Sequence, residues 1–298
     1  MAEQKIELRK IRDFGLNIND SFLFLRQNLQ PLLKAFFAIC GVFMIGHAIF
    51  SGLYQSRMGG VFQQLFSGRV KAGQYNTNPY NNIFSIEYLM VLIFLLLTFV
   101  SMKVVLASYL KFYLENEGRQ PSIDDIWRIF RKYFFKVFLF SIPVYLITII
   151  GFVFCLAPGF YFWVVLVPFC MVIVIEDTGF GTAFNRCFEI IRQNFWISIA
   201  IYLVAYLIYY VSTLIIGVLA TVLVGLGAWF TTKNIGATIG IATSFLNIFS
   251  YMFYIIYFVS GALHYFTLVE QRDGTGMLQR IDTIGSGESS FDNIEEQY

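Results

Sequence analysis

Charge is the first thing that this sequence lacks. Only 13% of its 298 residues are Asp, Glu, Lys or Arg, against about 25% in an ordinary soluble domain. A soluble enzyme, a disordered chain and a nucleic-acid-binding domain all need a charged or polar surface. The composition therefore excludes these three classes and leaves no role for a nucleic-acid partner. With 57% hydrophobic residues, the chain reads as a membrane protein whose first partner is the lipid bilayer.

Histidine and paired cysteine are also scarce. The chain has two histidines, His47 and His264, and four cysteines at positions 40, 155, 170 and 187. None of the cysteines shows the paired spacing of a metal site, and cysteine in an apolar helix usually behaves as a small hydrophobic residue. We therefore expect no disulfide, no metal and no cofactor.

Long uncharged runs predict six membrane spans. One charge at the bilayer centre costs about 2.5 to 3.5 kcal/mol, and a span needs about 20 helical residues. The run from Val137 to Ile175 is too long for one span, and Ala157-Pro158-Gly159 predicts a turn that folds it into a tight hairpin. The predicted spans lie near residues 31–54, 85–110, 134–156, 159–176, 196–220 and 238–266.

The lysines and arginines predict the orientation. One side of the membrane would carry sixteen of them and the other side four, with Lys103 inside a span. The positive-inside rule then places both termini in the cytoplasm and a loop, 55–84, outside. We expect one helical membrane domain over 1–272 and a polar, disordered cytoplasmic tail over 273–298 that is available to partners.

A threefold repeat organises the spans. Arg26, Arg131 and Arg192 each precede an odd-numbered span, and apolar residues recur 8, 4 and 1 positions before and 3 positions after each arginine. This spacing draws one apolar stripe along a helix, which predicts an amphipathic helix that lies in the cytoplasmic interface and then bends into the membrane. Each even-numbered span ends in an apolar, then acidic, then glycine segment. The repeats cover about 17–118, 122–179 and 181–274; convergence of flanking sequences is the alternative explanation.

Cap residues are expected at the start of two interfacial helices. Asn17 with Asp20, and Ser122 with Asp125, have the types and spacing of N-terminal caps.

Several segments carry a family resemblance. The stretches 17–34 and 109–136, Val174-Ile175-Glu176-Asp177, Ala183-Phe184-Asn185-Arg186 and Ile191-Arg192-Gln193-Asn194-Phe195-Trp196 resemble the membrane domain of glycerophosphoryl diester phosphodiesterase and its stand-alone bacterial relatives. The resemblance covers about 11–220. It implies an all-helical protein of the bacterial cytoplasmic (inner) membrane. The phosphodiesterase barrel that carries that family's hydrolytic residues is missing, so the resemblance transfers architecture and no activity.

Residues for catalysis are not evident. The sequence has no paired-histidine helix motif and no phosphate loop. Glu115 with Glu117, and Glu176 with Asp177, have the spacing of paired carboxylates. We interpret them as solvated span ends that pair with the arginines of the interfacial helices.

Two features inside the membrane are candidates for a polar site. Lys103 is the one charge within an otherwise apolar span, and such charges are functional hypotheses by default; the alternative is a lysine that extends its ammonium to the headgroups. The sixth span also carries one polar face, and its polar members are Asn247, Tyr251, Tyr254 and His264. Hydrogen bonding between packed helices is the alternative for these residues.

The sequence therefore favours a non-enzymatic integral membrane protein with an accessory or scaffold role, working with a membrane-protein partner or as a homo-oligomer. The alternative is a small-solute or lipid transporter that uses Lys103 and the polar face of the sixth span. A membrane enzyme is the third class.

The orientation is open to a direct test. Single cysteines at Ser67 or Asn234 are expected to react with an impermeant maleimide outside intact cells, whereas cysteines at Ser122 or Ser286 are not. The opposite labelling pattern would reverse the orientation.

Overall fold

The computed structural model describes residues 6–66, 85–116, 118–231 and 235–274, and most of them are helical. Side chains are described in these ranges except over 57–66 and 227–240. Residues 275–298, which make up all but the first two residues of the expected tail 273–298, lie outside the described part. The helices are α1 (Phe14–Phe66), α3 (Ile86–Glu115), α4 (Ile123–Phe154), α5 (Leu156–Leu166), α6 (Phe169–Ile175), α7 (Phe180–Ile191), α8 (Phe195–Thr231) and α9 (Ile235–Asp273).

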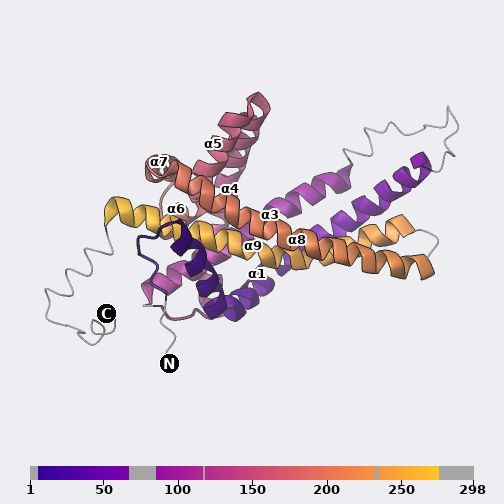
Figure 1. Ribbon diagram of the computed structural model, residues 1–298, viewed down its shortest axis with the longest axis horizontal. Helices are drawn as coiled ribbons and strands as arrows, with labels where there is room; N and C mark the ends of the chain where they lie inside the picture. Colours follow the sequence, from indigo (N-terminus) through magenta and orange to yellow (C-terminus); the bar gives the residue numbers. More distant parts are fainter. Residues whose placement is uncertain (1–5, 67–84, 117, 232–234, 275–298) are drawn as a thin grey trace.

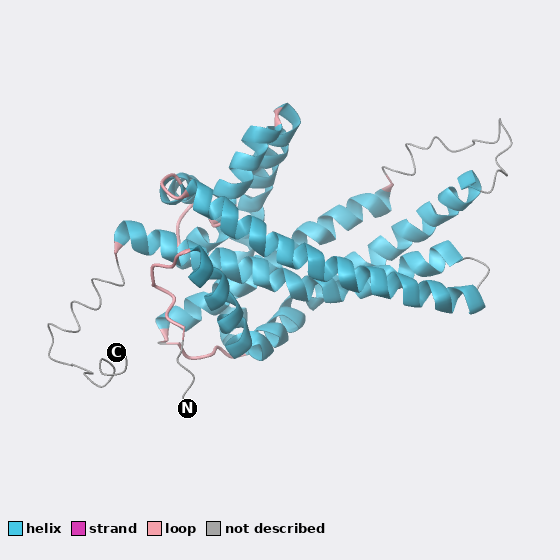
Figure 2. Ribbon diagram, viewed as in Figure 1, coloured by secondary structure: helices cyan, strands magenta, loops and turns pink. Residues whose placement is uncertain are grey.

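Six helical segments are long and apolar enough to cross a membrane, and α5 with α6 together form the fourth. Figure 2 shows helices and loops and no strand among the residues that it colours. In a bilayer only helices and closed barrels satisfy their backbone hydrogen bonds internally. The prediction of an all-α polytopic membrane protein is confirmed.

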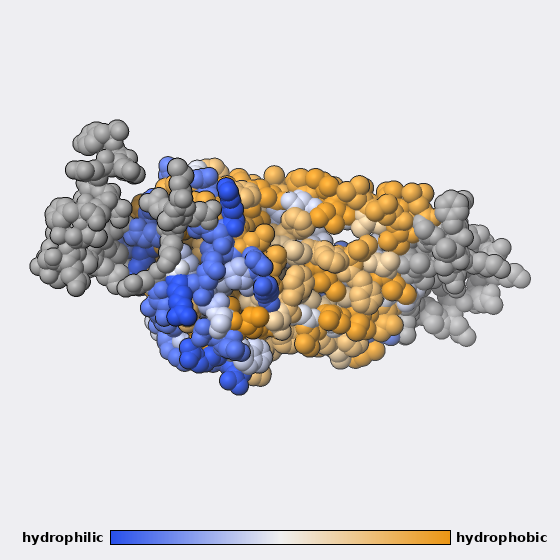
Figure 3. Space-filling model, turned by 90° about the horizontal axis from the view of Figure 1, so that it is seen from below, coloured by the Kyte–Doolittle hydropathy of each residue, from blue (hydrophilic) through white to orange (hydrophobic). Residues whose placement is uncertain are grey.

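The helices form a long bundle with one side arm. Helices α1, α3, α8 and α9 run along the long axis, and the α4–α5 hairpin projects sideways from it (Figure 1). Helix α9 packs against α1 and α8, and α3 packs against α1 and α4. Hydrophilic residues gather at one end of the molecule and apolar residues cover the rest of the described surface in Figure 3. This division matches a membrane domain with a polar cap on one side.

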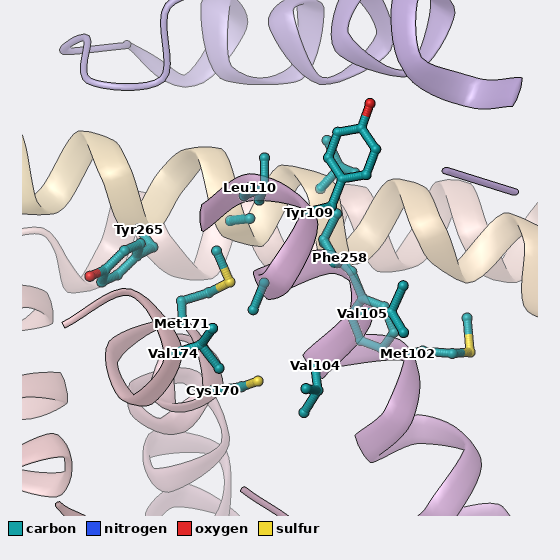
Figure 4. Close-up of a cluster of buried hydrophobic side chains, with 14 of the residues drawn as sticks. Met102, Val104, Val105, Tyr109, Leu110, Cys170, Met171, Val174, Phe258 and Tyr265 are labelled. Carbon is teal, nitrogen blue, oxygen red and sulfur yellow. The ribbon is translucent and has the colours of Figure 1, made fainter. Parts of the chain in front are cut away.

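Helix α3 lies at the centre of the core. Every residue from Val100 to Leu110 is buried except Lys103, which is partly exposed. Figure 4 shows side chains of α3 between α6, which contributes Cys170 and Met171, and α9, which contributes Phe258. A helix that is apolar on all faces is typical of a protein core or a membrane span, and this half of α3 is buried among other helices.

Helix α1 bends near Pro31 (Figure 1). Proline has no N–H to donate to the carbonyl four residues earlier, here that of Gln27. The amide of Gln120 supplies the missing donor at 3.1 Å and also reaches Asn28 at 3.3 Å, while the Tyr109 hydroxyl donates to Asn28 at 2.9 Å. The bend is therefore held by hydrogen bonds from two other parts of the chain.

The prediction that Asn17 and Asp20 cap the first interfacial helix is wrong. Helix α1 begins earlier than the sequence predicts, and Asp13 accepts the capping hydrogen bond from a backbone N–H at 2.7 Å. Asn17 instead accepts from Ser260 of α9 at 3.0 Å, and Asp20 binds Arg12 at 2.7 Å. Both residues serve tertiary contacts because a full helical turn precedes them.

The second interfacial helix begins as predicted, with a capping box between Ser122 and Asp125. The three interfacial segments lead into their spans differently. The first bends, the second continues straight on as one helix, α4, and the third ends at Ile191 before α8 begins at Phe195. The threefold repeat stays a prediction.

The turn of the central hairpin differs from the prediction. Helix α4 ends at Phe154 and the extended residue Cys155 reverses the chain, so Pro158 and Gly159 lie in the first turn of α5. Proline is tolerated there because first-turn N–H groups have no partner within the helix. A Cβ on Gly159 would meet the backbone nitrogen of Phe152 at 2.6 Å. Glycine at this position lets α4 and α5 approach closely.

The loop that the sequence predicts over 55–84 also starts later than predicted. Helix α1 continues to Phe66, so the first part of the expected loop 55–84 is helical. Residues 67–84 lie outside the described part of the chain.

Substituting the hairpin glycine should destabilise the protein. Gly159→Ala is expected to cost about 1 to 3 kcal/mol, because the added methyl overlaps backbone that cannot move independently. Gly217→Ala is the matched control, since a Cβ there meets nothing within 4 Å. Thermal unfolding in detergent should show a lower Tm for Gly159→Ala alone. Equal Tm values for the two variants would contradict the close packing of α4 on α5.

Candidate functional site

A cavity of about 270 Å³ lies between the α4–α5 hairpin and the bundle. Five helices contribute to its wall, through residues such as Lys103 of α3, Tyr145 of α4, Trp163 of α5, Cys170 of α6 and Tyr254 of α9. The sideways projection of the hairpin explains why the space exists, because α4 and α5 diverge from the bundle that they adjoin (Figure 1).

Lys103 is the one charged residue in the cavity wall. Its ammonium donates a hydrogen bond to the Tyr145 hydroxyl at 3.2 Å. It also lies 5.4 Å from the centre of the Tyr145 ring and 5.8 Å from that of Phe258, within the range of cation–π attraction. Lys103 makes no ion pair with any residue that the structure describes. Its charge is thus only partly compensated by protein.

The polar groups around Lys103 are hydroxyls, and only the phenols among them can donate to a ligand. The hydroxyls of Ser141 and Thr148 donate to carbonyls of their own helix at 2.7 and 2.9 Å. The Tyr145 hydroxyl accepts from Lys103, which leaves its proton free to donate. Tyr254 and Tyr257 add two more phenols, and no Asp or Glu lines the cavity. One cation with several O–H donors is the chemistry of an anion site.

The rest of the wall is apolar. It is made by aromatic and aliphatic side chains that include Phe99, Leu106, Val144, Trp163 and Phe258. A ligand that fits both parts has an anionic group and an apolar body.

The structure brings together only two of the predicted site residues, Lys103 and Tyr254. Tyr251 instead shares a hydrogen bond of 2.9 Å with His47 of α1. Asn247 is exposed on the apolar surface of the bundle. Successive residues of one polar helix face therefore have different surroundings, because the hairpin covers only part of α9.

His264 lies outside the cavity wall, between α8 and α9. It shares a hydrogen bond of 2.8 Å with Ser198, and the Tyr202 ring packs edge-on at 5.5 Å. All three side chains are buried. The Nδ1 atom of His264 and the hydroxyl of Tyr202 have no hydrogen-bond partner among the described residues. None of the three lines the cavity beside Lys103, and hydrogen bonding between packed helices accounts for their contacts.

The interfacial arginines Arg26, Arg131 and Arg192 are exposed. Arg131 lies 5.9 Å from the Trp127 ring. None of the three forms an ion pair with a described residue.

Other cations bind the acidic end of the fourth span. Glu176 pairs with Arg186 at 3.3 Å, and Asp177 pairs with Lys132 at 2.9 Å and Lys136 at 3.6 Å. The hydrogen bond from Lys132 lowers the pKa of the Asp177 carboxyl below its usual value. These pairs join α4 and α7 to the C-terminal end of α6. The sequence predicted that basic residues of the interfacial helices would pair with this acidic segment, but the arginines that it singled out were Arg26, Arg131 and Arg192.

Sequence reasoning missed the contribution of α4 to the site. Ser141, Tyr145 and Thr148 recur at i, i+4 and i+7 in an otherwise apolar span, which is the spacing of one helix face. This spacing in the sequence indicates a polar face on the third predicted span.

The comparisons with known proteins identify no relative. No protein-family model matches the chain, no curated protein matches it, and no solved structure matches it.

A chemical probe can test whether the cavity is accessible. In a chain whose four native cysteines are replaced by alanine, Lys103→Cys is expected to react with N-ethylmaleimide at least about tenfold faster than Ser108→Cys, because a thiol needs access to react. Ser108 is a buried residue of the same helix. Equal rates would mean that helices fill the space around position 103.

Proposed function

We propose that this protein is a non-enzymatic, lipid-handling protein of the bacterial cytoplasmic membrane, with both termini in the cytoplasm. In this proposal the cavity beside Lys103 binds the anionic headgroup of an amphiphile. The single observation that carries the proposal is an ammonium with no carboxylate partner in the described part of the chain, set among phenol donors inside an apolar bundle.

The charge of Lys103 supports a bound anion. A charged group inside a membrane is costly unless it is paired or solvated. One hydrogen bond and two aromatic rings compensate part of that cost. An anionic ligand would supply the missing opposite charge, and the phenols of Tyr145, Tyr254 and Tyr257 would donate to its oxygens.

The apolar wall supports an amphiphile over a soluble ion. The cavity of about 270 Å³ is below the usual range for a whole drug-sized ligand. It therefore suits a headgroup with the first part of a chain. The remainder of the chain would lie beyond the cavity, in the surrounding bilayer.

An accessory or scaffold role is the function that composition alone favours, and the cavity is the observation that shifts our preference to ligand handling. The kinship with the membrane domain of glycerophosphoryl diester phosphodiesterase is retained as a proposal about architecture. Flux of a labelled lipid or solute through liposomes that contain the protein would separate the two roles, since a scaffold gives none. Such flux should vanish in Lys103→Ala.

Trp163 provides a built-in reporter of ligand binding. The chain has four tryptophans, so replacing the other three, at positions 127, 196 and 229, by phenylalanine leaves only the cavity residue. Brominated dodecanoate is expected to quench Trp163 fluorescence, and brominated dodecanol is not. Lys103→Met should weaken the quenching by dodecanoate at least about tenfold, which corresponds to roughly 1.4 kcal/mol.

Two variants make that titration decisive. Lys103→Arg keeps the charge and should retain most of the affinity, and Lys136→Met removes a cation outside the cavity and should change nothing. Equal quenching by the carboxylate and the alcohol, or an unchanged affinity in Lys103→Met, would refute the anion site.

A further inference from the structure

A second feature, separate from the Lys103 cavity, is an open groove at the polar end of the molecule. It lies between the bent part of α1 and the first turn of α4. Its polar lining is Arg26, Gln30 and Lys34, and its apolar lining includes Leu29, Phe37 and Ile123.

The cations of this groove have no ion-pair partner in the described part of the chain. Arg26 and Lys34 are exposed and form no ion pair with the residues that the structure describes. By contrast Lys132, Lys136 and Arg186, at the same polar end, are paired with carboxylates. The groove therefore brings together two positive charges that no carboxylate of the described residues neutralises.

The polar residues follow one another along the helix. Arg26, Gln30 and Lys34 are spaced by four residues, which is about 6 Å of rise per step. Arg and Lys are donors only, and the amide of Gln30 adds N–H groups between them. This row of donors suits a phosphate that bridges two turns of the helix.

The apolar residues of the groove are exposed as well. Leu29, Phe37 and Ile123 have relative exposures of 44%, 40% and 43%. Lys34 directly precedes the uncharged run that starts at Ala35. The groove thus lies where the charged residues of α1 give way to its uncharged part. A soluble anion would leave its apolar half uncovered, and a neutral lipid would leave its charges unmatched.

We propose that this groove binds an anionic phospholipid of the adjoining leaflet, with the headgroup phosphate between Arg26 and Lys34 and an acyl chain along Leu29 and Phe37. Basic pockets that adjoin membrane helices bind anionic headgroups in this way. The bend at Pro31 shapes the site, because Arg26 and Lys34 lie on opposite sides of it.

The test is thermal unfolding of the full-length, delipidated protein in an uncharged detergent. Added phosphatidylglycerol should raise the Tm more than phosphatidylcholine does, because a ligand that binds the folded state stabilises it. The double variant Arg26→Gln with Lys34→Gln should lose more than about half of that shift. The matched control, Arg131→Gln with Arg192→Gln, removes two exposed cations that also form no ion pair with a described residue and lie outside the groove, and it should keep the shift.

Further measurements identify the ligand and distinguish loss of binding from a folding defect. Inorganic phosphate alone should give no shift, and an equal shift would assign the site to soluble anions and overturn the proposal. Gln30→Glu leaves both cations in place but adds a negative charge between them, and it should also abolish the phosphatidylglycerol shift. An unchanged shift in both the double variant and Gln30→Glu would refute the groove. Lys103→Met should keep the shift, so the two sites succeed or fail separately.

Discussion

The organising constraint of this structure is that a charge inside an apolar helix bundle has to be paired or solvated. Helix α3 is buried over Val100 to Leu110 except at Lys103. Tyr145 and Phe258 solvate the ammonium in part, with a hydroxyl and two ring faces. The hairpin that supplies Tyr145 diverges from the bundle, so a cavity remains beside the charge (Figure 1). Lys103 therefore belongs both to the packed centre of the bundle and to the candidate site.

The same constraint acts on the polar backbone. Pro31 frees a carbonyl of α1, and Gln120 from the loop before α4 satisfies it. Arg12, which is buried, donates to Asp20 and to the carbonyls of Glu7, Leu8 and Lys10. Such hydrogen bonds hold the polar end of the molecule in one arrangement, because leaving a buried group unpaired costs about 1 to 3 kcal/mol. Arg26 and Lys34 form no ion pair with a described residue, and they share one groove that a ligand can occupy.

The fold class was predictable because uncharged runs report directly on the cost of burying charge. The capping box at Ser122 and Asp125 was also predictable, since caps depend on local spacing. The sequence predicted the hairpin turn at Ala157-Pro158-Gly159, but these residues lie in the first turn of α5. Proline and glycine are compatible with either position. At the site, Lys103 was found from its isolation in the sequence. Its partner Tyr145 lies 42 residues away, and only tertiary packing selects it from many tyrosines.

The most direct test of the central claim is an experimental density map of the protein in lipid nanodiscs. The account predicts an elongated density whose head lies within hydrogen-bond distance of the Lys103 ammonium and the Tyr145 hydroxyl. Its tail should run from the cavity into the surrounding bilayer, and it should disappear in Lys103→Met. A map in which the hairpin packs flush against α3 and α9, with no density beside Lys103, would contradict the account.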